Sequence, residues 1–74
     1  MTKAIHDPTH IGAAFLGTTD AERDRLLTAW GVLHPGETTV ASRTWPDVWE
    51  IWNDGECIGW IEYPETGVVT VVRT

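Results

Sequence analysis

The dipeptide Asp54-Gly55 lies between two apolar segments, and this arrangement constrains the fold more than any other feature of the chain. The segments run from Val48 to Trp52 and from Glu56 to Tyr63. Both are rich in Trp and Ile, residue types that favour strands. Asp-Gly tolerates the positive φ angles of a type I′ turn, which joins two antiparallel strands directly. The sequence therefore predicts a β-hairpin that turns at Asp54-Gly55.

Two further segments extend this hairpin into a predicted β-meander over residues 38–73. The segment Thr38–Arg43 is rich in Thr and Val and is typical of a short strand. Beyond the hairpin, the residues from Pro64 to Gly67 form a second turn signal, since Pro and Gly stand at its two ends. A valine-rich segment, Val68–Arg73, follows it. We expect these four strands to pair in chain order.

The first half of the chain carries helix signals over residues 7–31. Asp7-Pro8 is a start signal, and Gly17 would end a first helix over residues 7–17. Thr19 and Glu22 have the spacing of a capping box, so a second helix is expected to begin there and to end at Gly31. Its buried stripe would consist of Ala21, Leu26, Leu27, Ala29 and Trp30.

The fold class predicted from these segments is α+β, with two short N-terminal helices packed on one face of a three- to four-stranded antiparallel β-meander. A chain of 74 residues is expected to form one domain, residues 1–74. Cys57 is the only cysteine, so no disulfide within the chain can stabilise it. We therefore expect the five tryptophans to supply much of the core, with at least three of them mostly buried.

A two-residue loop at Asp54-Gly55 also predicts a register and two faces of the sheet. It pairs Asn53 with Glu56, Ile51 with Ile58, Trp49 with Trp60 and Val48 with Ile61. The face turned to the helices would then carry Trp49, Ile51, Ile58, Trp60, Val69 and Val71. The exposed face would carry Val48, Glu50, Trp52, Cys57, Gly59, Ile61, Tyr63, Val68, Thr70 and Val72. This register places Asp47 opposite Glu62, and two like charges in that position destabilise a sheet.

The negative charge of the chain is concentrated in its second half. The net charge is −6, and the segment from Thr44 to Val72 holds six acidic residues and no Lys, Arg or His. Such a surface repels nucleic-acid phosphates and attracts basic proteins. We expect a partner with a basic surface, a protein or complex that itself binds nucleic acid, and neither direct nucleic-acid binding nor membrane binding. Acidity that serves only solubility remains an alternative. The chain is expected to be a monomer or a weak homodimer.

The predicted partner-binding residues combine this charge with exposed aromatic side chains. Apolar area that stays exposed on a sheet face is typical of an interface, and Trp and Tyr dominate binding energy at many interfaces. Trp45, held extended by Pro46, could be either a core residue or an exposed anchor. Trp52 is the tryptophan expected to point outward. The predicted set is Asp47, Glu50, Trp52, Asp54, Glu56, Glu62, Tyr63 and Glu65.

The residues that could support catalysis or metal binding do not form a convincing site. His6 and His10 are separated by Pro8 and do not share a helix face, so a zinc site is not expected. Cys57 has an acidic and an apolar neighbour, which do not activate a thiol. In the predicted register Glu50 and Glu62 lie on opposite faces, so they cannot act as an acid/base pair. We predict no enzyme activity, no cofactor and no metal, and a cytoplasmic location, since neither a signal peptide nor a membrane-spanning segment is evident.

In size, acidity and predicted layout the chain resembles the anti-CRISPR proteins encoded by phages. That class binds a host nuclease complex and prevents recognition of target DNA, and it shares no common motif. The resemblance implies an inhibitor acting in the host cytoplasm, whose acidic residues contact Lys and Arg that otherwise hold nucleic acid. Two other functions remain open. One is an assembly module that pairs through its exposed sheet face or through the strand Val68–Val72. The other is a small-ligand or carbohydrate binder that uses Trp52 and Tyr63 as a stacking platform.

Overall fold

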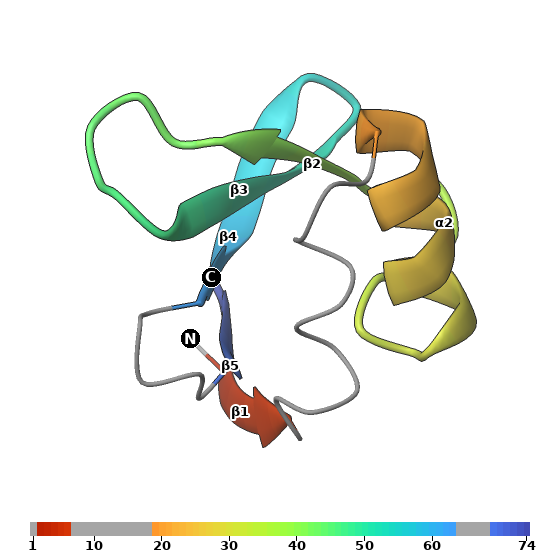
Figure 1. Cartoon of the computed structure of the whole chain (residues 1–74), viewed down its shortest axis with the longest axis horizontal. Coiled ribbons are helices and arrows are strands. Elements are labelled where there is room, and N and C mark those ends of the chain that lie inside the picture. The colour runs from red at the N-terminus through yellow and green to blue at the C-terminus, as the bar shows by residue number, and fades with distance from the viewer. Residues whose placement is uncertain (1, 7–18, 64–68) are drawn as a thin grey trace.

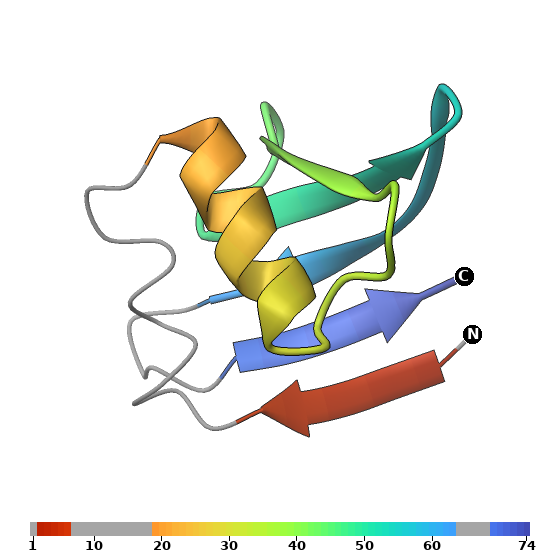
Figure 2. The same cartoon turned by 90° about the vertical axis from the view of Figure 1, so that its right-hand side faces the viewer.

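The computed structural model describes residues 2–6, 19–63 and 69–74, with the backbone alone for residues 2–6. One antiparallel sheet and one helix make up the fold of these residues (Figures 1 and 2). The sheet has the strand order β1-β5-β4-β3-β2. Its strands are β1 (Thr2–His6), β2 (Thr38–Ala41), β3 (Val48–Asn53), β4 (Glu56–Glu62) and β5 (Val69–Arg73), and the helix is α2 (Asp20–Ala29).

Helix α2 begins and ends at the signals found in the sequence. The Thr19 side chain accepts a hydrogen bond from the backbone N–H of Glu22 at 3.2 Å, which satisfies one of the free donors at the helix start. At the other end Gly31 has a φ of 78°, a left-handed conformation that favours glycine. Figure 2 shows that α2 crosses one face of the sheet, so the helix does not cover the opposite face.

The β3–β4 hairpin has the predicted turn but not the predicted register. Asp54 and Gly55 have φ angles of 52° and 77°, so the sequence signal for a positive-φ turn is confirmed. Asn53 pairs with Glu56 as expected. The pairing then shifts between Trp52 and Ile51, because Cys57 pairs with Trp52 whereas Gly59 pairs with Ile51. Ile58 is therefore an extra residue, a β-bulge, on strand β4.

The bulge reverses the faces of β4 beyond Ile58, so the predicted register is wrong there. Trp60 pairs with Glu50 instead of Trp49, and Ile61 pairs with Trp49 instead of Val48. A shift of one residue moves every following side chain to the other face of the sheet. The shift also removes the predicted contact of like charges, because Glu62 lies opposite Val48.

The hydrophobic core lies between the sheet and the segment formed by α2 and the loop after it. Its fully buried side chains are aliphatic, and they come from the helix, from this loop and from strands β3, β4 and β5. They are Leu27, Val32, Leu33, Ile51, Ile61, Val69 and Val71. Leu26, Trp30, Ile58 and Tyr63 pack against this cluster while remaining partly exposed. The prediction that Leu26, Leu27 and Trp30 form the buried stripe of the helix is confirmed, whereas Ala21 and Ala29 are exposed and do not belong to it.

The expectation of two N-terminal helices on a three- to four-stranded sheet is wrong. The described residues contain one helix, and the sheet has a fifth strand, β1, which pairs with β5. The predicted first helix, residues 7–17, lies outside the described residues. Strand β1 is only five residues long, and its pairing partner is more than sixty positions away, so local sequence signals do not reveal it. Because β5 lies between β1 and β4, the segment Val69–Arg73 is not a free edge.

Four of the five tryptophans are mostly buried, which confirms the expectation of at least three, although they surround the aliphatic core rather than form its centre. Trp30, Trp49, Trp52 and Trp60 are partly buried, and Trp45 is 67% exposed. None of the five belongs to the fully buried set, because the aliphatic side chains fill the space between helix and sheet.

Two side chains of α2 bind the outer edge of strand β2. Arg23, which is buried, donates from Nε to the Thr39 hydroxyl at 2.8 Å and from Nη2 to the Thr39 carbonyl at 3.3 Å. The Asp24 carboxylate accepts from the backbone N–H of Thr39 at 3.0 Å and also from its hydroxyl. The helix therefore satisfies backbone groups that an exposed sheet edge would offer to another strand.

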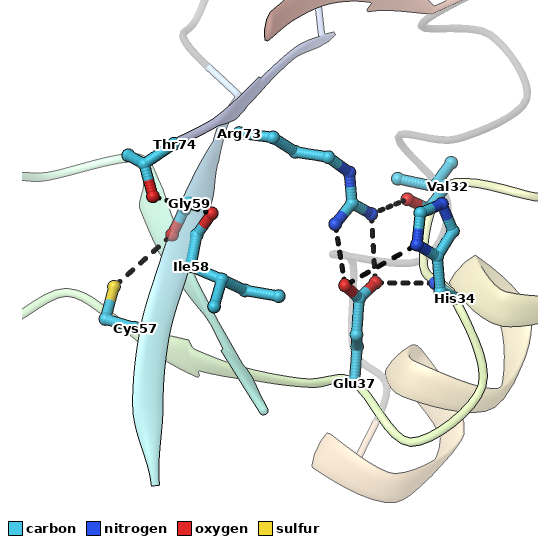
Figure 3. Close-up of polar contacts among 8 residues, drawn as sticks. All are labelled: Val32, His34, Glu37, Cys57, Ile58, Gly59, Arg73 and Thr74. Carbon is cyan, nitrogen blue, oxygen red and sulfur yellow. Dashed lines mark hydrogen bonds and ion pairs between the residues drawn. The ribbon is translucent and has the colours of Figure 1, made fainter. Parts of the chain in front are cut away.

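A second polar cluster ties β5 to the loop after α2 (Figure 3). The carboxylate of Glu37, whose side chain is 3% exposed, accepts two hydrogen bonds from Arg73, at 2.6 and 2.9 Å. It also accepts the backbone N–H of His34 at 2.5 Å, while Arg73 donates to the Val32 carbonyl at 2.8 Å. The hydrogen bonds from Arg73 and the backbone of His34 hold the pKa of Glu37 below its ordinary value of 4.5, against the opposing effect of burial.

Replacing Gly59 with alanine is expected to destabilise the fold, because a Cβ atom there would lie 2.2 Å from the carbonyl oxygen of Val72. We expect Gly59→Ala to lower the free energy of unfolding by roughly 3 kcal/mol, measured by urea denaturation. Gly55→Asn is the control, since asparagine tolerates the left-handed conformation of that turn residue, and it should cost less than about 1 kcal/mol. Equal stability of Gly59→Ala and the parent protein would contradict the close approach of β5.

The Glu37 cluster predicts a specific pH dependence of stability. A carboxylate whose pKa is lower in the folded state stabilises the fold above its ordinary pKa, and this contribution disappears as the pH falls through the lowered value. Glu37→Gln should therefore cost roughly 3 kcal/mol at neutral pH, and the difference from the parent protein should shrink below about pH 4.5. Glu56→Gln, at an exposed position, is the control. A Glu37→Gln difference that stays constant from neutral pH to acid would contradict this account.

Candidate functional site

The face of the sheet opposite α2, called the open face below, carries a groove of about 580 Å³. Strands β3 and β4 form its floor, and the loop between β2 and β3 forms one side. This loop and α2 lie at opposite sides of the molecule in Figure 1. Cavities that bind ligands commonly have volumes of about 300–1,000 Å³. The groove, called the acidic groove below, is lined by Ser42, Trp45, Pro46, Val48, Glu50, Cys57, Gly59, Trp60 and Glu62.

Two Trp–Glu pairs with mirrored sequence order lie on the open face. In β3 the order is Glu50-Ile51-Trp52, and in β4 it is Trp60-Ile61-Glu62. Residues two apart in a strand share a face, so each pair projects together. The Trp52 indole N–H donates to the Glu50 carboxylate at 3.1 Å, and the Trp60 indole N–H donates to the Glu62 carboxylate at 2.8 Å. These bonds fix both carboxylates and both indole rings.

The two pairs are adjacent because of the bulge at Ile58. Trp60 is the cross-strand partner of Glu50, and Glu62 is the partner of Val48. In the predicted register Trp60 would have faced the helix, and Glu50 and Glu62 would have been on opposite faces. Both expectations are wrong, because the register shift brings Trp60 to the open face with Glu50 and Glu62. The Glu-x-Trp and Trp-x-Glu spacing is the sequence signal that could have identified Trp60.

The loop that carries Trp45 is held by Ser42. The Ser42 hydroxyl accepts hydrogen bonds from the backbone N–H groups of Thr44 and Trp45, at 3.2 and 3.0 Å. Ser42 itself donates its backbone N–H to the Val48 carbonyl at 2.9 Å, which anchors the loop to the start of β3. Asp47 turns the chain back into the strand with a φ of 58°. Trp45 is therefore placed on the side of the groove as an exposed aromatic residue, which answers the question left open by the sequence.

The predicted partner-binding residues do not all come together. Glu50 and Glu62 line the acidic groove, and Trp52 lies with Glu50 at a second hollow of about 330 Å³, which Arg43 also lines. Asp54 and Glu56 are exposed at the hairpin turn, and Asp47 is exposed in the preceding loop. Tyr63 packs against the core cluster, so it does not form a platform with Trp52. Glu65 lies outside the described residues.

The two carboxylates of the groove have similar surroundings. Each is partly buried, and each accepts one indole N–H. Two carboxylates on one face, each with a free oxygen, can accept hydrogen bonds from a positively charged group.

No group of three or more His, Cys, Asp or Glu side chains within residues 19–63 and 69–74 is arranged to hold a metal ion. No described helix is both long and apolar enough to cross a membrane. Comparison of the chain with protein-family models, with curated proteins and with solved structures finds no match.

The hydrogen bonds of the Trp–Glu pairs can be tested one at a time. In Glu62→Ala the Trp60 indole N–H loses its acceptor, so its NMR resonance should move upfield and its hydrogen exchange should become faster. We expect the free energy of unfolding to fall by only about 1 kcal/mol, since the site is partly exposed. Glu50→Ala should affect Trp52 in the same way, and Glu56→Ala should affect neither indole. A Trp60 indole signal that is unchanged in Glu62→Ala would contradict the pairing.

Proposed function

We propose that the protein is a non-enzymatic inhibitor that binds another protein and covers its basic nucleic-acid-binding site. The acidic groove is the surface that makes this contact. The proposal places the protein in the cytoplasm, which is that of a host cell if the protein is encoded by a phage. The partner would be a nucleic-acid-binding protein or complex.

The observation that carries this proposal is the combination of charge and aromatic area on the open face. Trp45 and Trp60 line a groove whose charged side chains, Glu50 and Glu62, are both negative. Aromatic residues dominate the energy of many protein interfaces, while complementary charge sets specificity and the rate of association. A basic surface matches both properties.

The same charge pattern sets a limit on nucleic-acid mimicry. Alternate residues of a strand lie about 6.6 Å apart, a spacing that could imitate phosphates. A sheet whose strands are about 20 Å long matches a stretch of DNA duplex with about 12 phosphates. The segment Thr44–Val72 has six acidic residues, so its density of negative charge is at most about half that of the duplex. We therefore propose that the protein blocks a basic groove of its partner without closely imitating a DNA duplex.

An RNA-guided nuclease complex is the most specific partner that we propose. Such a complex holds nucleic acid in a positively charged channel. The chain resembles anti-CRISPR proteins in its size and its acidity, and the acidic groove gives this resemblance a surface on which it can be tested. Self-association through the open face is the second candidate, because Val40 and Trp45 are 50% and 67% exposed.

The proposal predicts a partner that nucleic acid displaces. Immobilised protein should capture a nucleic-acid-binding protein from host lysate at low salt and release it at high salt or when a DNA or RNA competitor is added. The purified partner should then lose binding to its nucleic acid in a gel-shift assay when the inhibitor is added in equimolar amount.

The double variant Glu50→Gln, Glu62→Gln should inhibit much less than the parent protein. The matched control is Asp20→Asn with Glu22→Gln, which removes the same charge from the exposed start of α2. A captured partner whose nucleic-acid binding is unaffected by the inhibitor would refute the proposed function. Dimerisation that rises with concentration in sedimentation experiments, with no captured partner, would favour self-association instead.

A further inference from the structure

We propose that the acidic groove is a receptor for one arginine side chain of a partner protein, an inference that rests on the proposed function and specifies its central contact. The guanidinium group would stack on the indole of Trp60, with Trp45 on the other side of the groove. Its N–H groups would donate to Glu50 and Glu62.

The side chains that line the groove offer more hydrogen-bond acceptors than donors. The carboxylates of Glu50 and Glu62 supply four oxygens, and one oxygen of each accepts an indole N–H. The Trp60 N–H is used by Glu62, and the Cys57 thiol donates to the Gly59 carbonyl at 3.4 Å. Ser42 and Trp45 add one O–H and one N–H donor, so a ligand that fits this lining brings more donors than acceptors. Arginine carries five N–H donors and no acceptor.

No basic side chain of the described residues neutralises these carboxylates. Among residues 19–63 and 69–74, the ion pairs join Arg23 to Asp20, and Arg73 and His34 to Glu37. Arg43 lines the neighbouring hollow beside Glu50 without forming an ion pair there. Within these described residues, no side chain supplies the positive charge that would complement the groove.

The aromatic lining favours arginine over lysine. A cation over the face of an aromatic ring is attracted by the ring electrons, and tryptophan gives the strongest effect. The planar guanidinium both stacks on an indole and reaches a carboxylate with two parallel N–H groups, whereas an ammonium group acts as a compact, strongly hydrated charge. The fixed positions of Trp60 and Glu62 reduce the ordering that binding would require.

The groove can be tested with defined peptides, without knowledge of the partner. The probes are capped glycine-serine peptides that contain one arginine, one lysine or one citrulline, the last being an uncharged analogue of arginine. Binding is followed by the NMR shift of the Trp60 and Trp45 indole N–H signals and by tryptophan fluorescence. We expect the arginine peptide to bind about tenfold more tightly than the citrulline peptide and more tightly than the lysine peptide, with affinity that falls as salt rises.

Variants of the protein show whether the peptide binds at the groove or is attracted by the overall negative charge of the protein. We expect two variants to lower the affinity for the arginine peptide by roughly five- to tenfold. One is Trp45→Ala, at an exposed position, and the other is the double variant Glu50→Gln, Glu62→Gln. Asp20→Asn with Glu22→Gln removes the same two charges from the exposed start of α2 and should change affinity less than about twofold. Urea denaturation confirms that each variant is folded.

Three outcomes would overturn the inference: equal binding of the arginine and citrulline peptides, lysine binding as tight as arginine binding, or equal losses in the groove variants and in the variant at the start of α2. These failures are distinct from a failure of the proposed function. If a partner is captured and inhibited but the groove variants behave as the parent protein does, the arginine site alone is wrong. If the peptide binds as expected but no partner is displaced by nucleic acid, the proposed function is wrong.

Discussion

The extra residue at Ile58 determines which side chains of β4 face the core and which face the open side of the sheet. Without it, Trp60 would point toward α2 and Ile61 would point outward. With it, Ile61 enters the aliphatic core, and Trp60 joins Glu50 and Glu62 on the open face. Gly59 permits this arrangement because β5 approaches its backbone so closely that a side chain would collide with the Val72 carbonyl. Thr74, which directly follows β5, also holds the bulge, because its backbone N–H and its hydroxyl both donate to the Ile58 carbonyl (Figure 3).

The two faces of the sheet perform different tasks. On the helix side, Arg23 and Asp24 bind the edge of β2, and Glu37 binds Arg73 of β5, so the polar contacts there are internal. On the open face, the carboxylates of Glu50 and Glu62 have indole N–H groups as partners and no described cation. This asymmetry supports the proposal that the open face meets a basic partner.

Local signals in the sequence predicted local structure well. The capping residues of α2 and the positive φ angles of Asp54 and Gly55 follow from short-range chemistry, and the structure has both. The bulge was not predicted, because an isolated glycine such as Gly59 can mark a bulge but does not say which residue is unpaired until β5 is placed beside it. Strand β1 depends on the same long-range pairing. Glu50, Glu62 and Trp52 were assigned to a binding surface from charge and aromatic character, whereas Trp60 and Trp45 required the register and the loop.

The position of Trp60 is the most direct test of this account, because the groove exists only if its indole lies on the open face. Cross-strand nuclear Overhauser effects between β3 and β4 report the register without any mutation. The account predicts contacts between backbone protons of Trp60 and Glu50, and contacts between those of Ile61 and Trp49. Contacts between Trp60 and Trp49, as in a hairpin without a bulge, would place Trp60 under the helix and contradict both the groove and the function proposed for it.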